Sequence, residues 1–367
     1  MKFDIKSPQY FSVSRRPAVF NRMLSMVVCL MIGLLVCQHA TADEIVRRSA
    51  KSGVKGKIQK ITPAEIVLKP RSGADIKIPV NDIIRIRFDG EPPSLNLART
   101  SELNGALERA LEGFTKAKAA VKNNKNLAAE VDFLIARTNA RLATGSTEKM
   151  QTAVQQLTDF VTKQKTNIRF YEAINLLSAL HLQSGELAKA REVASPLKNA
   201  PVKSLKMTAQ IIEGRALLAE QKPAEAAAAF QAANAMAGND PAEKAKALEC
   251  LLGTAMCQQV QKQFEPAIAT LDQVLDKIDV KDTVVQAEAY LRRGDVYRAQ
   301  GKTKEAVYEY LHVDLLFSAH KALHAEALFN LAQLWSVNGH ADRAAEARAT
   351  LTSDYGASSW AKKLAGG

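Results

Sequence analysis

Small residues recur at a nearly constant interval along most of this 367-residue chain. An alanine stands at each of seven positions that lie 36 to 43 residues apart: Ala110, Ala153, Ala190, Ala226, Ala267, Ala306 and Ala344. A large apolar residue follows four positions after five of them: Phe114, Leu157, Phe230, Leu271 and Tyr310. Because residues i and i+4 share a helix face, each pair predicts a helix that approaches a neighbour closely at the alanine. The period predicts stacked helical hairpins whose neighbours complete one continuous core.

Glycines mark several of the turns that such hairpins require. Gly105, Gly185, Gly301 and Gly339 each precede one of the recurring alanines, and glycine accepts the left-handed backbone conformation of a tight turn at no steric cost. The frame predicts about seven hairpins over residues 95–360. The fold class expected is therefore mostly α, a solenoid of helical hairpins.

One stretch carries a family resemblance. Tyr290, Gly294, Tyr297, Gly301, Ala306 and Tyr310 stand in the order and spacing of a tetratricopeptide repeat, with Arg293 where leucine is usual. The chain resembles that family, which implies a superhelix whose concave side is lined by the first helix of each hairpin. The last unit, residues 329–335 and 351–361, also resembles repeats of bacterial envelope proteins, although the proline of their Tyr-Pro-x-Ser is missing.

The resemblance also implies a partner-binding groove. Transferred to this sequence, the family's groove positions are Asn175, Ile211, Arg215, Leu218, Met256, Gln259, Leu291, Asp295, Arg298, Phe329 and Gln333. This mixture of apolar and polar side chains suits an extended peptide or a partner helix. It lacks the Lys/Asn cluster of the carboxylate-clamp arrays. The alternative is that these positions simply face solvent.

The first 42 residues have the pattern of an export signal. Arginines flank an apolar run at 23–36, and the small-x-small pattern of a cleavage site follows before Asp43. Fourteen apolar residues reach about 21 Å in a helix, less than a bilayer core of ~30 Å. We therefore expect an exported protein, periplasmic or associated with the outer membrane, with no spanning helix after cleavage. An uncleaved anchor and lipidation at Cys37 are the alternatives, the latter disfavoured by the β-branched Val36.

Residues 43–93 change to the period of two that is typical of strands, and 94–367 form the predicted repeat domain. Four or five short strands resemble a small SH3-like or Sm-like barrel, so the predicted module is β-barrel-like. Its outward side chains would form a basic face: Lys55, Lys57, Lys77, Arg85 and Arg87. This face could bind an anionic polymer such as wall polysaccharide, or it could be a solvated face that discourages edge pairing. Nucleic acid is an unlikely partner, because no aromatic residue interleaves the charges and the chain is exported.

Composition excludes several classes of protein. The formal net charge is +12, and four cysteines in 367 residues do not make a disulfide framework. His320 and His324 have the i, i+4 spacing of metal ligands, but the glutamate of hydrolytic zinc sites is absent between them. We therefore predict no catalytic residue, metal, cofactor or small-molecule substrate. The main hypothesis is a non-enzymatic scaffold for an envelope protein partner. The remaining alternative, an accessory subunit of an envelope enzyme, would need a pocket between the β module and the array.

Overall fold

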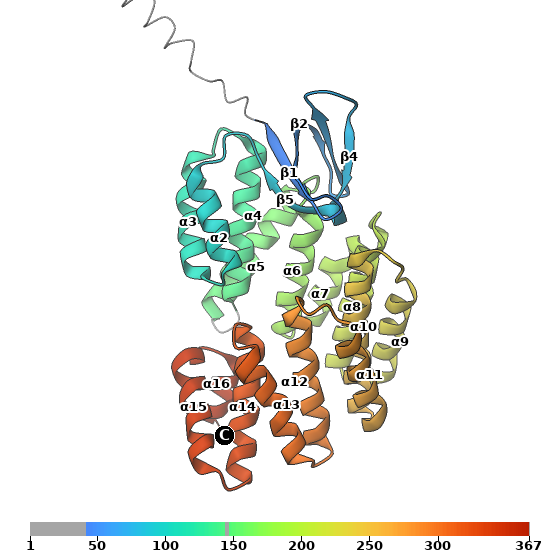
Figure 1. Ribbon diagram of the computed structural model, residues 1–367, viewed down its shortest axis with the longest axis vertical. Helices are drawn as coiled ribbons and strands as arrows, with labels where there is room; N and C mark the ends of the chain where they lie inside the picture. Colours follow the sequence, from blue (N-terminus) through green and yellow to red (C-terminus); the bar gives the residue numbers. More distant parts are fainter. Residues whose placement is uncertain (1–41, 144–146, 367) are drawn as a thin grey trace, which may run out of the picture. The chain divides into compact units, whose positions relative to one another are not determined.

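The computed structural model describes residues 42–143 and 147–366, so the predicted export signal lies outside the described residues. The described chain begins with five strands and a short 3-10 helix, η1 (Figure 1). The strands are β1 Asp43–Arg47, β2 Val54–Ile61, β3 Glu65–Pro70, β4 Ile76–Pro79 and β5 Ile83–Arg87, and η1 is Val80–Asp82. They form one antiparallel sheet in the order β4-β3-β2-β1-β5, with register shifts in β1 and β2. This confirms the predicted small β module, although within the described residues no ladder joins its edge strands β4 and β5.

Seven helical hairpins follow the sheet, as the repeat frame predicts (Figure 1). The pairs are α2 Pro93–Leu103 with α3 Leu107–Ala120, α4 Lys125–Leu142 with α5 Thr147–Lys163, α6 Phe170–Gln183 with α7 Leu187–Ala194, α8 Lys203–Ala219 with α9 Pro223–Ala235, α10 Pro241–Val260 with α11 Phe264–Lys277, α12 Thr283–Ala299 with α13 Thr303–Leu316, and α14 Lys321–Val337 with α15 Ala341–Tyr355. A 3-10 turn, η2 Ser195–Asn199, extends α7, and α16 Ser359–Gly366 packs on the last hairpin.

The recurring alanines all lie on the second helix of a hairpin, and each is at most 1% exposed. The large residues four positions later are buried as well, with Phe114, Leu157, Leu271 and Tyr310 fully covered. Gly214, Gly253 and Gly294, on the facing first helices, leave room for these side chains. An ideal Cβ on Gly294 would lie 2.7 Å from the Tyr310 ring. Neighbouring helices therefore pack closely because a large side chain of one helix fits against a glycine of the facing helix.

The turns inside the hairpins use the left-handed backbone region. The four predicted turn glycines have φ between 74° and 77°. The hairpins α8–α9 and α10–α11 have no glycine there, and Gln221 (φ 62°) and Lys262 (φ 59°) adopt the same conformation. A side chain with a Cβ is strained in this region by about 1–2 kcal/mol.

Replacing Gln221 or Lys262 with glycine is therefore expected to stabilise the protein. The relief of strain exceeds the added entropy of an unfolded glycine, so the net gain should be about 0.5–1 kcal/mol per site. Urea unfolding of Gln221→Gly, Lys262→Gly and the reciprocal Gly185→Gln measures this, with Gly185→Gln expected to lose stability by a similar amount. A loss of stability in both glycine variants would contradict the turn assignment.

The first helices form the inner layer of the array. Each of α4, α6, α8, α10 and α12 contacts the first helix of the next hairpin, whereas no comparable contact joins neighbouring second helices in the described part of the chain. Closer spacing of the first helices bends the stack toward them. The concave side is therefore lined by first helices, as the family resemblance implies.

The sheet and the first hairpins share one hydrophobic core. Ile45, Leu68 and Ile86 of the sheet belong to the same buried cluster as Leu95 of α2 and Phe114 of α3. The sheet and the array therefore belong to one compact unit, Asp43–Gly367. Removing the sheet would expose this cluster, so the function of the sheet is best tested by point substitutions on its outer surface.

Candidate functional site

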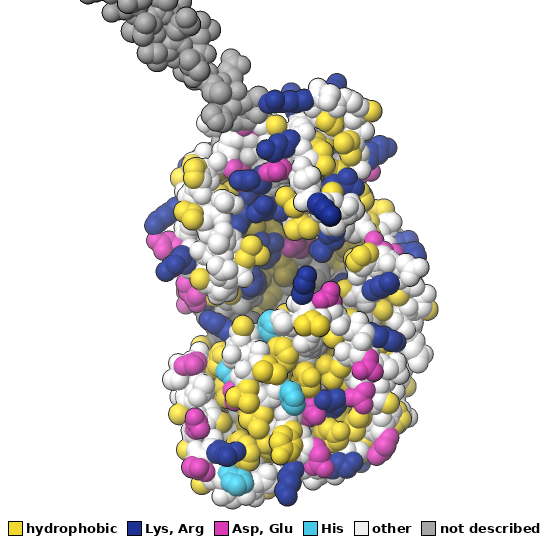
Figure 2. All heavy atoms as spheres, in the orientation of Figure 1, with side chains coloured by type: hydrophobic (Ala, Val, Ile, Leu, Met, Phe, Trp, Pro, Cys, Tyr) yellow, Lys and Arg dark blue, Asp and Glu magenta, His cyan; other side chains and the backbone are white. Residues whose placement is uncertain are grey.

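A hollow of about 390 Å³ lies between the sheet and the concave side of the array. One wall comes from the sheet end, with Arg48, Asn81 and Ile84, and the other from α4, α6, α8 and α10. Figure 2 shows this face of the molecule hollowed at its centre, with Lys and Arg side chains around the upper part of the opening. Polar side chains from the helices reach the hollow at its sides: Arg137, Arg169, Glu172, Asn175, Ser204, Thr208 and Lys246.

The two walls are joined by a hydrogen bond. The Asn81 side-chain amide donates to the Asp240 carboxylate at 3.2 Å. Asp240 also caps α10, since its side chain accepts from the backbone N–H groups of Ala242 and Glu243. This arrangement holds the tip of the sheet at the N-terminus of α10, and it thereby fixes one side of the opening.

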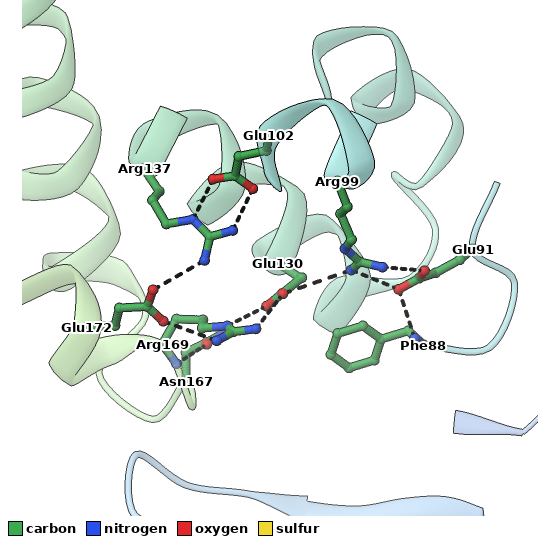
Figure 3. Close-up of polar contacts among 9 residues, drawn as sticks. All are labelled: Phe88, Glu91, Arg99, Glu102, Glu130, Arg137, Asn167, Arg169 and Glu172. Carbon is green, nitrogen blue, oxygen red and sulfur yellow. Dashed lines mark hydrogen bonds and ion pairs between the residues drawn. The ribbon is translucent and has the colours of Figure 1, made fainter. Parts of the chain in front are cut away.

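A chain of ion pairs reaches the lining of the hollow through Arg137, Arg169 and Glu172 (Figure 3). Arg169 pairs with Glu130 at 2.9 Å and with Glu172 at 3.0 Å. Arg137 continues the chain, because it pairs with Glu172 at 3.2 Å and with Glu102 at 2.7 Å. These residues lie on α2, α4, α6 and the α5–α6 loop, so the chain crosses three hairpins.

The same chain reaches the linker that leaves the sheet. Arg99 of α2 bonds to Glu91 at 2.6 Å and approaches Glu130 at 3.9 Å. The Glu91 carboxylate also accepts from the Phe88 backbone N–H at 3.0 Å. The sheet, its linker and the first three hairpins are therefore connected by one network of charges, as Figure 3 shows.

Burial raises the cost of any charge left unpaired in this network. For Glu130, burial is the largest single effect and raises the pKa, but Arg169, Arg99 and Arg137 together outweigh it, so the pKa is lowered from its ordinary value. For Arg169, burial lowers the pKa and the carboxylates of Glu130 and Glu172 more than compensate, so the pKa is raised. Each group stays ionised because its partners are in place.

The lining that remains accessible carries more positive than negative charge. Arg48 is exposed and has no ion pair within the described residues, and Lys246 pairs with Glu249 at 2.5 Å. Glu172 is the acidic residue on the lining, and Arg137 and Arg169 already neutralise it. These side chains can donate hydrogen bonds and attract an anionic group. In the described lining no histidine or second carboxylate accompanies them.

The predicted groove residues fall into four groups, and the members of three of them are at least partly accessible. Asn175 lines the hollow itself. Arg215, Arg298 and Gln333 are exposed on first helices of later hairpins, where Arg215 is 3.9 Å from Glu249 and Arg298 donates to Asn330 at 2.8 Å. The partly buried residues are Leu218, Met256, Gln259 and Phe329.

Three predicted groove residues are not on a surface. Ile211 is 2% exposed and Leu291 is fully buried, because each points into the core of its own hairpin rather than along the concave side. Asp295 is 8% exposed and accepts hydrogen bonds from Tyr310 at 2.7 Å and Arg292 at 2.6 Å. The prediction that a partner contacts these three side chains is therefore wrong.

The predicted basic face is assembled by the register of the sheet. Lys55 and Arg87 both lie opposite Glu44, and Arg85 lies opposite Val46 of the same strand. Lys57 lies opposite Lys69, and Lys77 lies opposite Val67. Cross-strand partners share a face, so all five predicted residues lie on the side away from the core. Lys69 belongs to the same face and was missed by the sequence pattern.

The candidate metal ligands have structural partners. His324 is 6% exposed, with Nδ1 2.7 Å from the Tyr355 hydroxyl and Nε2 2.7 Å from Asp314. His320 contacts the Thr283 hydroxyl at 2.9 Å. In the part of the chain that the structure describes, no group of three or more His, Cys, Asp or Glu side chains could hold a metal ion. Cys250 and Cys257 are free and buried, and burial raises the pKa of their thiols to about 12 and about 11.

Comparison with known proteins identifies the fold of the array. The chain matches the crystal structure of a Rap protein complexed with Competence and Sporulation Factor, with a TM-score of 0.52 at 14% identity, over 74% of this chain and 77% of that one. The array has a tetratricopeptide-like fold. A tetratricopeptide repeat protein from Parabacteroides merdae matches with a TM-score of 0.46 at 16% identity, over 71% and 91% of the two chains. PilW, a type IV pilus biogenesis factor, matches with a TM-score of 0.43 at 18% identity, over 64% and 97%.

Neither a protein-family model nor a curated protein matches the sequence. Among the described residues, no helix has the length and apolar character needed to cross a membrane.

Sequence reasoning missed most of the hollow. Its residues Arg48, Asn81 and Lys246 come from three distant segments, and only the packing of the sheet on the array brings them together. The chain of ion pairs, in contrast, leaves a pattern in the sequence from which it could have been predicted. Glu102, Arg137 and Glu172 are 35 residues apart, so opposite charges alternate at one repeat length.

Proposed function

We propose that the protein is an exported, non-enzymatic scaffold that binds a peptide segment or helix of a cell-envelope partner along its concave side. The hollow of about 390 Å³ between sheet and array carries the proposal, because it opens a space lined by hydrogen-bonding side chains on the inner layer of a solenoid. Periplasmic or outer-membrane location is part of this proposal and rests on the export pattern of residues 1–42.

The charges of the lining define the segment that fits. Arg48 and Lys246 lie on opposite walls, whereas Glu172 is held by two arginines. A partner segment with an acidic side chain would meet both cations, and Asn175, Ser204 and Thr208 offer hydrogen bonds to its backbone. From the hollow, the exposed Arg215, Arg298 and Gln333 extend the surface along later first helices.

The alternative function, an accessory subunit of an envelope enzyme, requires a pocket between the β module and the array. The pocket exists, but the one carboxylate of its described lining, Glu172, is paired with two arginines, and the other polar groups are cations, amides and hydroxyls. This lining offers no acid–base pair suited to proton transfer. The chemistry of these side chains favours binding over catalysis.

Reversing the charge of the hollow should weaken binding. Peptides would be selected from a displayed random library against the chain from Asp43 onward, and their affinities measured by fluorescence anisotropy. We expect acidic peptides to be enriched, and Arg48→Glu and Lys246→Glu to lower their affinity at least about 10-fold, since each places a repulsive charge in a confined site.

Arg348→Glu is the matched control, because Arg348 is exposed on α15, a second helix outside the concave layer. It changes the net charge by the same amount and should leave affinity within about twofold. Equal losses in all three variants would mean that the peptides respond to overall charge, and the hollow would not be their site.

A further inference from the structure

The sheet has a second surface, on the side opposite the core, which the hollow does not use. We call it the outer face and define its cations by the cross-strand register: Lys55, Lys57, Lys60, Lys69, Lys77, Arg85 and Arg87. The five lysines are exposed. The inner face of the same strands is covered, since Ile45, Ile66 and Ile86 are fully buried.

The charges of the outer face are poorly compensated inside the protein. Lys57 stands directly opposite Lys69, and like charges at paired positions destabilise a sheet. Within the described residues the one ion pair on this face joins Arg87 to Glu44 at 3.2 Å. Five lysines on one small sheet therefore create a positive potential that the folded chain does not neutralise.

The chemistry of this face selects its partner. Lysines dominate, and a lysine ammonium acts as a point charge, without the planar fork by which arginine recognises one phosphate or carboxylate. The described outer face also carries no aromatic side chain on which a sugar or base could stack. An extended layer of negative charge matches such a surface better than a discrete ligand does.

We propose that the outer face docks the protein on an anionic membrane surface, with its lysines against the lipid headgroups. Each lysine held near an anionic bilayer contributes to the attraction, so the five together can act without any inserted side chain. The hollow lies at the end of the sheet and its described lining includes none of the outer-face cations, so it stays open to a partner while the outer face is covered.

The position of the sheet in the chain is consistent with this orientation. Six residues, 37–42, lie between the apolar run 23–36 and the start of β1 at Asp43. Six extended residues span at most about 20 Å. In the alternative where that run stays in the membrane, only these six residues would separate the anchor from β1.

Vesicle binding tests the proposal with the chain from Asp43 onward, which forms one compact unit and lacks the apolar run. Sedimentation would compare phosphatidylcholine vesicles with vesicles containing about one third phosphatidylglycerol. We expect binding to the anionic vesicles alone, and about a 100-fold loss for the triple variant Lys57→Gln/Lys69→Gln/Lys77→Gln, since three headgroup attractions of roughly fivefold each are removed.

The control variant is Lys244→Gln/Lys277→Gln/Lys304→Gln, which removes three exposed lysines of the array and matches the change in net charge. It should bind anionic vesicles like the unmodified chain. Equal weakening by both triple variants, or no binding to anionic vesicles, overturns the proposal. So does retention of a soluble polyanion such as heparin with no vesicle binding, which would make the face a polymer site. The sheet variant should still bind hollow-selected peptides, so this result is separate from the scaffold proposal.

Discussion

Replacing Glu130 with glutamine is expected to lower the free energy of unfolding by about 3 kcal/mol, one of the largest losses for a single substitution in this protein. The Glu130 side chain is 3% exposed and accepts two hydrogen bonds from Arg169, at 2.9 and 3.0 Å. Glutamine has the same shape and no charge, so it would leave the Arg169 guanidinium, itself 12% exposed, with Glu172 as its remaining anion. Because that second anion stays, the loss should lie at the lower end of the range for a broken buried pair. Urea unfolding at pH 7 measures it.

Glu172→Gln is the matched control. Its carboxylate also pairs with Arg169, and with Arg137, but the side chain is 39% exposed, so water can replace the lost charge and the expected loss is below about 1 kcal/mol. Losses of equal size in the two variants would show that burial does not determine the strength of this network.

The contribution of Glu130 should also depend on pH in a defined direction. Its folded-state pKa is lower than its ordinary value, because burial raises it but Arg169, Arg99 and Arg137 together lower it by more. A lowered carboxylate pKa stabilises the fold fully above the unfolded pKa, about 4.3, and this contribution is lost as the pH falls through the folded-state value. The difference between unmodified protein and Glu130→Gln should thus stay constant from about pH 7 to about pH 5 and shrink below about pH 4.

The array was predictable because its packing rule repeats in the sequence. One alanine per hairpin lies at a helix crossing, and seven copies make the pattern recognisable even where one unit departs from it. In the last unit the exposed Arg348 stands four residues after Ala344, where the pattern calls for a large apolar residue. The inner layer was also predictable as a set of helices. The direction in which a single side chain points was not predictable: Ile211 and Leu291 lie on the predicted helices, but their side chains are buried in the core. A helix residue shifted by one position rotates about 100°, which is enough to move a side chain from surface to interior.

The candidate site was the least predictable part, because it depends on contacts that no local pattern encodes. The alternation in β2 and β5 predicts which side chains share a face, and the register confirms that Lys55, Lys57 and Arg87 do. The alternation contains no information on which helices the buried face covers. Asn81 donates a hydrogen bond to Asp240, which lies 159 residues later in the chain, and this packing of the sheet against α10 forms one side of the hollow.

Gly253→Ala is expected to destabilise the protein by about 2 kcal/mol, although alanine is the better helix former. A Cβ at this position of α10 would lie 2.4 Å from the Phe230 ring of α9. The ring has little room to move, because it is 1% exposed and also packs closely on Gly214 of α8, where an ideal Cβ would lie 2.8 Å from it. The helices α8 and α10 must then separate, and they carry Thr208 and Lys246 of the hollow. Thermal unfolding and peptide affinity should therefore both decline.

A double-mutant cycle with Phe230→Leu tests whether the ring is the cause. In the Gly253→Ala background the smaller side chain relieves the collision, so the two changes should couple by about 1 kcal/mol or more. Gly294→Ala provides the control: its Cβ would lie 2.7 Å from the Tyr310 ring in a different hairpin, so it should also destabilise the protein but add independently to Phe230→Leu. Additive behaviour in both pairs would mean that the helices separate without meeting the ring, and that Phe230 does not set the spacing of the inner layer around the hollow.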